Sequence, residues 1–163
     1  MPLEALKEGH RRALQAVDRL KAADGQAKQG ETAQAVTSAR GLLPFLENDQ
    51  RVHFRQEEEG LFLYLGYIIG DGPVQAMVGE HESYWKAIAS LKRLLDSPAD
   101  AGELHRQLQH IVYLLEGHIQ KEESAYFPLA ERRLSATQLQ AVDEEMETIA
   151  RLEQPARPST GSG

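Results

Sequence analysis

The sequence predicts an all-α protein: an antiparallel, up-down-up-down bundle of four long helices, followed by a short fifth helix. Three observations lead to this prediction. Apolar residues recur at helical spacing through four long stretches, and only three short connections separate those stretches. A ten-residue pattern, with histidine, two glutamates and phenylalanine at fixed offsets, occurs twice. The chain has 163 residues, which suits one domain with a substantial core.

The predicted helices cover residues 3–23, 32–66, 73–95, 100–131 and 135–151. The first buries a stripe made of Leu3, Leu6, Leu14, Val17 and Leu20. The apolar side of the third is formed by Val74, Met77, Val78, Trp85, Ile88, Leu91 and Leu95. Each stripe repeats every three or four residues, as a helix with one buried face requires. We therefore expect residues 1–152 to form one domain, with residues 3–131 as its core.

Glycine and proline mark the connections. Asp24, Gly25 and Gly30 are expected to form the first loop, and residues 66–73 the second. Pro44 falls inside the second helix and should kink or split it, because proline lacks a backbone N–H. In the fifth helix, residues 135–138 read as a capping box. Residues 153–163 are rich in proline, serine and glycine and are expected to be a disordered tail.

The repeated pattern pairs His53 with Glu57 and His118 with Glu122. Side chains four residues apart on a helix differ by only about 40° in direction, so each pair points at the same neighbour. Helix bundles build metal sites from such inward histidine and carboxylate pairs. One copy alone is more often part of a solvated helix face, but two copies with matching flanks favour a metal site.

Two further histidines, His10 and His81, lie on the apolar stripes of the first and third helices. Counting about 1.5 Å per residue places them at the same level of the bundle as the two repeated pairs. A single inward histidine is more often a hydrogen-bonded core residue. Four inward histidines and two inward glutamates at one level would be costly to bury without a cation. We therefore predict a metal centre with ligands His10, His53, Glu57, His81, His118 and Glu122.

Composition narrows the function classes. The net charge of −7 disfavours nucleic acid and anionic membranes as partners. Without cysteine, the chain has no disulfide, no thiolate metal site and no cysteine nucleophile. No apolar stretch is long enough to cross a membrane, and the first residues do not read as a signal peptide. A cytoplasmic protein is the expectation.

The chain resembles the hemerythrin-like (HHE cation-binding) family over residues 3–131. The resemblance rests on His10, His53-x-x-x-Glu57, the triplet Glu80-His81-Glu82, and His118-x-x-x-Glu122 followed by Tyr126-Phe127-Pro128. It implies a four-helix bundle with a non-haem di-iron centre. His10 and His53 would bind one iron and His81 and His118 the other. Glu57 and Glu122 would bridge the two irons, with an oxo or hydroxo group completing the centre.

The sequence departs from the oxygen-carrying hemerythrins, which it otherwise resembles and which share an H-x-x-x-H pattern on the third helix. Here Trp85 lies four residues after His81 and Met77 four before it, and neither replaces an imidazole. The chain is closer to the four-histidine, two-glutamate members, such as the iron-sensing hemerythrin domain of an F-box protein. Fewer imidazoles leave more open coordination, which favours a reactive, sensing or labile centre over simple oxygen carriage.

Several neighbours of these residues have two readings. Glu58 and Glu123 are expected to face solvent, with a role at the metals as the alternative. His105 and His110 are expected on the surface or behind the ligands. Tyr64 and Tyr126 are expected in the core, although either could donate a hydrogen bond to a ligand carboxylate. Gly9 and Gly117 directly precede ligand histidines, where close approach of another group would explain a glycine.

The leading functional hypothesis is a di-iron protein that binds or reacts with dioxygen, peroxide or nitric oxide during oxidative or nitrosative stress. An oxygen- or peroxide-consuming enzyme activity is compatible with it. The alternatives are an iron or redox sensor read by a partner protein, an iron-storage or iron-donor protein, and a metal-free or zinc-only bundle.

Overall fold

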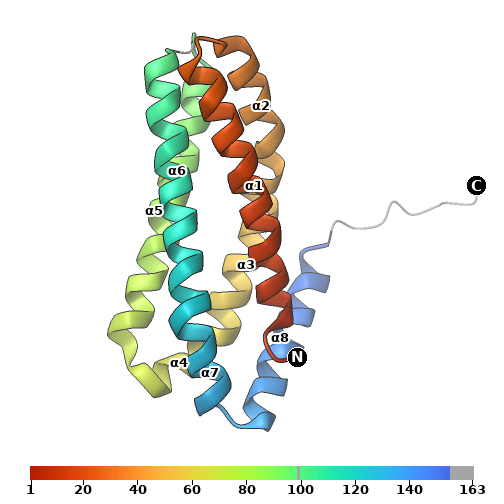
Figure 1. Ribbon diagram of the computed structural model, residues 1–163. Coiled ribbons are helices and arrows are strands. Elements are labelled where there is room, and N and C mark those ends of the chain that lie inside the picture. The colour runs from red at the N-terminus through yellow and green to blue at the C-terminus, as the bar shows by residue number, and fades with distance from the viewer. Residues whose placement is uncertain (99, 155–163) are drawn as a thin grey trace, which may run out of the picture.

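The computed structural model describes residues 1–98 and 100–154, and its architecture is the predicted all-α bundle (Figure 1). The first rod is α1 (Glu4–Lys28). The second is a continuous run of α2 (Thr32–Pro44), η1 (Phe45–Asp49), α3 (Gln50–Gln56), η2 (Glu57–Leu61) and α4 (Phe62–Ile69). The third is α5 (Asp71–Leu95), and the fourth joins α6 (Ala101–Lys121), η3 (Glu122–Tyr126) and α7 (Phe127–Arg133). The predicted fifth helix is α8 (Ala136–Leu152), and η1, η2 and η3 are π-helical.

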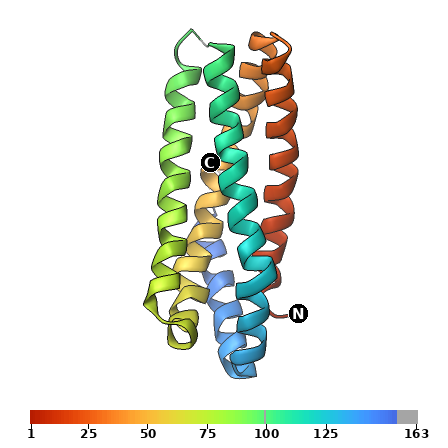
Figure 2. The same ribbon diagram turned by 60° about the vertical axis from the view of Figure 1, so that its left-hand side comes forward.

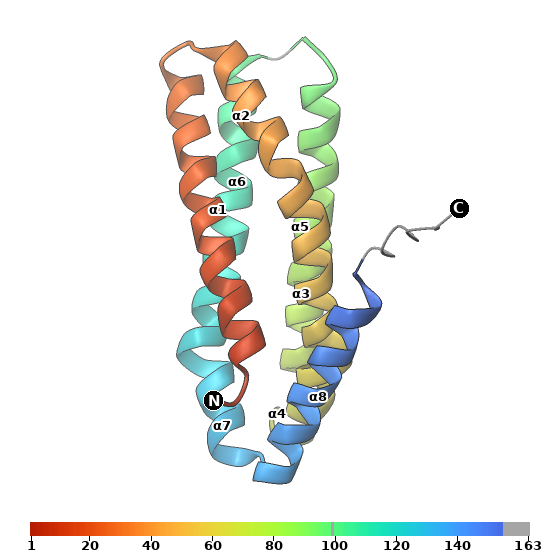
Figure 3. The same cartoon turned by 90° about the vertical axis from the view of Figure 1, so that its right-hand side faces the viewer.

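Consecutive rods run antiparallel and lie side by side (Figure 2). α1 packs between α2 and α6, and α5 packs between α6 and α4. α8 turns back after α7 and lies along α3 and η2, outside the four-rod bundle (Figure 3). Within residues 1–98 and 100–154, no helix is both long and apolar enough to cross a membrane.

The apolar core is divided into two clusters. The upper cluster joins α1, α2, α5 and α6 through residues such as Leu20, Leu46 and Leu91. The lower cluster joins the other end of the bundle to α8 through residues such as Leu6, Leu61 and Met146. Between them lies a layer of buried histidine and glutamate side chains. The fold therefore holds its polar groups in a closed layer with apolar packing above and below.

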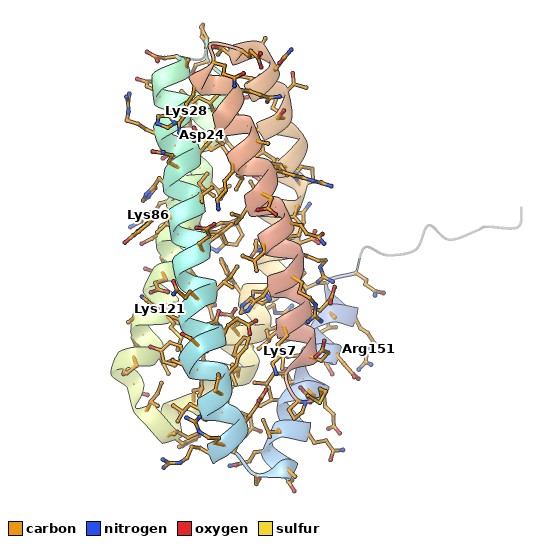
Figure 4. The ribbon with its side chains drawn as sticks, in the orientation of Figure 1. Lys7, Asp24, Lys28, Lys86, Lys121 and Arg151 are labelled. Atoms are coloured by element: carbon orange, nitrogen blue, oxygen red, sulfur yellow. The ribbon has the colours of Figure 1, made fainter. Side chains whose placement is uncertain are left out.

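Two predicted loops are shorter than expected. α1 continues to Lys28 because Asp24, although followed by glycine, is buried in the helix and bonded to His105 (Figure 4). The turn comes at Gly30, whose φ of 80° is left-handed and suits glycine. The predicted loop over residues 66–73 is also wrong, because α4 continues to Ile69 and only Gly70, with φ of 82°, links it to α5.

Pro44 neither splits nor breaks the second rod. The helix continues directly into the π-helical η1, whose wider turn follows the proline. A π-helical segment bonds i to i+5, so the rod absorbs the missing N–H by changing its hydrogen-bond spacing. At Pro128 the order is reversed, because this proline is the second residue of α7, which directly follows the π-helical η3.

Two predicted core residues are displaced from their expected places. Leu14 is 42% exposed, because the buried face of α1 is centred on Ala13, Ala16 and Val17. In α5, Tyr84 is buried and its hydroxyl donates to the Leu46 carbonyl at 2.7 Å. Trp85 is only half-buried and lines a surface groove. The buried face of α1 is made largely of small alanines, and a search for stripes of large apolar residues does not detect such a face.

The predicted capping box of α8 is confirmed. The Ser135 hydroxyl accepts from the Gln138 N–H at 3.1 Å, and the Gln138 side chain accepts from the Ser135 N–H at 2.9 Å. Past α8, Glu153 is described and accepts a bond from Arg55 at 2.9 Å. The rest of the predicted tail, residues 155–163, lies outside the described residues.

Candidate metal centre

The structure brings all six predicted ligands into one chamber between the two apolar clusters. Each is 5% exposed or less, and the two glutamates are fully buried. α1 supplies His10, the second rod supplies His53 and Glu57, α5 supplies His81, and the fourth rod supplies His118 and Glu122. Their donor atoms form two overlapping clusters, one of His10, His53, Glu57 and Glu122, and one of Glu57, His81 and His118.

Glu57 lies between the two histidine pairs. Its Oε1 atom is 2.5 Å from His53 Nε2 and 4.0 Å from His10 Nε2. Its Oε2 atom is 3.0 Å from His81 Nε2 and 3.2 Å from His118 Nε2. Each oxygen of this one carboxylate therefore faces a different pair, which is the arrangement that a carboxylate spanning two cations requires.

Glu122 joins the two pairs in a second way. Its Oε1 atom is 2.7 Å from His118 Nε2 and 3.4 Å from His10 Nε2, so it faces one histidine of each pair. Its Oε2 atom has no hydrogen-bond partner among the described residues. The two glutamates thus both contact histidines of both pairs.

The local helix geometry explains how the glutamates reach this position. Both stand four residues after a ligand histidine, and both are the first residue of a π-helical segment, η2 or η3. Single π-helical turns inside α-helices are rare and occur often at functional sites. The histidines therefore project from regular α-helix, while the carboxylates project from the point where each rod widens.

Phenylalanine rings enclose the histidines. Phe54 stacks on His81 with ring centroids 3.8 Å apart, and Phe62 stacks on the same imidazole at 5.7 Å. Phe127 stacks on His10 at 5.0 Å. These apolar contacts restrict water and hold the imidazole planes in fixed orientations.

Three carboxylates bind the outer nitrogens of the histidines. Glu123 Oε1 is 2.7 Å from His10 Nδ1, and Glu58 Oε1 is 2.9 Å from His81 Nδ1. The Glu58 and Glu123 side chains are 39% and 42% exposed, as the sequence predicts, and each also bonds a ligand imidazole, which is the predicted alternative. The third, Glu80, has its Oε2 atom 2.6 Å from His118 Nδ1 and also pairs with Lys121 (Figure 4).

Other residues near the ligands have plainer roles. His110 is exposed, and His105 bonds to Asp24 far from the chamber. Neither Tyr64 nor Tyr126 makes a hydrogen bond to a ligand carboxylate within residues 1–98 and 100–154. A Cβ atom at Gly9 would lie 3.0 Å from His53 Cε1 and closer still to Nδ1, so this glycine is required by close approach. At Gly117 a Cβ atom would meet nothing within 4 Å.

The charges inside the chamber perturb the ligand groups strongly. Burial alone would lower the pKa of His118, but the carboxylates of Glu122 and Glu57 raise it to about 12. Burial alone would raise the pKa of Glu57, but His53 and His118 hold it well below its usual range. Without a cation, ionised glutamate is therefore balanced by protons on imidazole.

Protonation of the histidines still leaves several buried nitrogen and oxygen atoms of the chamber without a hydrogen-bond partner. Six buried atoms have no hydrogen-bond partner among the described residues: His10 Nε2, His53 Nδ1, His53 Nε2, Glu57 Oε1, Glu122 Oε1 and Glu122 Oε2. Of these, His53 Nε2 and Glu57 Oε1 lie within ion-pair distance of each other, but their angles do not make a hydrogen bond. Buried unpaired nitrogen and oxygen atoms are costly, and a cation placed among five of them would pair them. The residues therefore fit a metal centre with mixed nitrogen and oxygen ligands.

Comparison with known proteins agrees with this geometry. The model of the hemerythrin HHE cation-binding domain matches residues 1–130, which include all six residues of the chamber. Neither the curated proteins nor the solved structures gave a match. With most of its length matched and the six side chains brought together, the chain belongs to the hemerythrin HHE cation-binding domain family.

Proposed function

We propose that the chain holds two iron ions and that this centre binds or reacts with a small oxidant: dioxygen, peroxide or nitric oxide. The observation that supports the proposal best is Glu57, whose two oxygens face separate histidine pairs at 2.5 to 4.0 Å. Two adjacent irons, when bound, supply the electrons that such an oxidant takes up.

The side chains divide naturally between the two ions. His10 and His53 would hold one and His81 and His118 the other, with Glu57 and Glu122 shared. Two imidazoles and two shared carboxylates would leave coordination positions open on each ion, and imidazole and carboxylate are ligands that suit iron. The stacked phenylalanines surround the polar chamber with apolar side chains, so a small uncharged ligand enters more readily than a charged one.

The test is iron content together with the ultraviolet–visible spectrum. Protein loaded with ferrous iron without air should contain two irons per chain, and charge-transfer bands should appear on exposure to air, peroxide or nitric oxide. His118→Ala should lose one iron, because it removes a ligand of one ion. His110→Ala, an exposed histidine on the same helix, should keep both. One iron per chain in the unaltered protein, or two retained in His118→Ala, would contradict the assignment.

A second candidate function is an iron sensor whose folding depends on the metal. It is favoured by the unpaired buried atoms, which the metal-free chain must tolerate. Metal binding would then add directly to folding stability. Circular dichroism at constant pH distinguishes the two functions: a sensor should lose helix on iron removal, whereas a centre that only reacts with oxidants should keep it.

A further inference from the structure

The outer nitrogens of the four histidines are not equally supported. His81 and His118, which form one half of the centre, both bond a carboxylate through Nδ1, from Glu58 and Glu80. In the other half, His10 bonds Glu123 through Nδ1. A carboxylate on the outer nitrogen fixes the tautomer and orientation of a ligand imidazole and makes it a stronger ligand.

His53 lacks such support. It is 4% exposed, and its Nδ1 atom has no hydrogen-bond partner among residues 1–98 and 100–154. The atom faces Gly9 of α1, where a Cβ atom would collide with it. The outer side of the ring therefore rests against the α1 backbone instead of a carboxylate.

His53 also differs in its access to solvent. It lines a surface cavity of about 270 Å³ between α1, α3 and the end of α8, together with Arg12, Gln56 and Ala150. A second groove, of about 620 Å³, adjoins this cavity and shares Asn48, Arg51 and Glu153 with it. It lies between the second rod and α5 and reaches Glu58, but the ring of Phe54 separates it from His81. One half of the centre thus has a ligand in the wall of a solvent cavity, while the other half is closed by a stacked ring.

We propose that the two halves hold their cations unequally. The His81–His118 half is the tighter site, and the His10–His53 half exchanges its cation through the cavity beside His53. This inference rests on the proposed two-cation centre. Loss of one supporting carboxylate typically weakens metal binding about 10–100-fold, so the two halves should differ by that order.

The experiment is anaerobic release of ferrous iron to a coloured chelator, starting from protein with two irons per chain. We expect two phases, each of one iron per chain, with rates that differ about 10-fold or more. Glu58→Gln should accelerate only the slow phase, and Glu123→Gln only the fast phase. Glu116→Gln is the matched control, because this glutamate on α6 is 43% exposed and pairs with Lys21 rather than with a ligand.

The route is tested separately. Ala150→Phe fills the cavity beside His53 and should slow both uptake and release in the fast phase, with equilibrium affinity unchanged. Ala89→Phe, which fills the adjoining groove on the α5 side and does not line the cavity beside His53, should alter neither phase. Equal slowing by both variants would reject the cavity as the route.

The outcomes separate this inference from the proposed function. Fewer than two cations per chain at saturation would overturn both. Two cations that leave in a single phase, or acceleration of the fast phase by Glu58→Gln, would overturn the inequality and leave the two-cation centre standing.

Discussion

At the scale of single residues, Glu57 ties the two halves of the centre together. Its carboxylate is fully buried, and each oxygen contacts a different pair of histidines. Glu122 also contacts one histidine of each pair, but through a single oxygen, whereas Glu57 presents a separate oxygen to each pair. Loss of Glu57 should therefore affect both cations rather than one.

Glu57→Gln should weaken binding of both cations, because the amide keeps the shape but removes the charge between them. Loss of a group behind a ligand already weakens binding about 10–100-fold, and a ligand itself should matter more. Anaerobic titration with ferrous iron measures the effect. Glu59→Gln, two residues later and paired with Arg55 at the surface, is the control and should bind normally. Normal binding by Glu57→Gln would contradict a bridging role.

Gly9 and Gly117 make a matched pair for substitution by alanine. Gly9→Ala should displace His53 and lower the free energy of unfolding of the iron-loaded protein by about 1–3 kcal/mol. Gly117→Ala meets no atom and should stabilise the helix by about 0.5–1 kcal/mol. Denaturant unfolding of both variants provides the measurement, and equal stability of the two would show that Gly9 is not required by contact with His53.

Metal uptake should release protons. The pKa values of His10, His81 and His118 are raised in the metal-free chain, despite burial that lowers them, by carboxylates beside them. A cation needs neutral imidazole, so bound protons must leave and affinity should rise with pH. By the same logic, the stability that His118 contributes without metal is complete below pH 6.5 and is lost as pH rises towards about 12. A pH indicator during anaerobic loading at pH 7 should show acidification, and none would contradict these shifts.

At the scale of the elements, α8 supports the part of the second rod that carries Glu57. Gln56 donates a hydrogen bond to the Met146 carbonyl at 2.9 Å, and Met146 packs on Gly60 of η2. The N–H of Leu3, whose φ of 61° is left-handed, donates to Asp143 at 3.0 Å. α8 thus holds both the start of α1 and the π-helical turn that begins at Glu57.

Met146→Ala should destabilise the protein and loosen that turn. Met146 is fully buried, and truncation of a buried methionine to alanine costs about 2–5 kcal/mol. Leu152→Ala, on the same helix but 67% exposed, should cost much less. Thermal unfolding with and without iron measures both. A Met146→Ala protein as stable as Leu152→Ala would show that α8 is not part of the core.

Sequence periodicity predicted the rods and the six convergent side chains because both depend on which face of a helix a residue occupies. It could not predict the π-helical turns, since the sequence pattern before Glu57 and Glu122 is that of an ordinary helix. It also missed the pairing of Glu80 with His118, because that contact joins two rods whose rotation is set by packing. The loop at Asp24 was wrong for the same reason, as its partner His105 lies on another helix.

At the scale of the whole molecule, the bundle consists of two apolar bodies joined through the polar chamber. In the upper body, α1, α2, α5 and α6 meet mainly through buried apolar side chains. The lower body is smaller and depends on α8, α4 and the first residues of the chain. The four rods pass through both bodies and through the chamber between them. A structural change in one body must therefore cross the chamber to affect the other.

This division implies that the molecule can open from one end. Emptying the chamber should raise amide hydrogen exchange first in α3, α4, α7 and α8, while the upper parts of α1 and α6 stay protected, since local opening follows contiguous packed units. Exchange measured by mass spectrometry on iron-loaded and chelator-treated protein would reveal this. Uniform deprotection would mean that the rods unfold together. An end that frays when iron is scarce, beside one that holds its shape, would give a protease or a binding partner a graded readout of cellular iron.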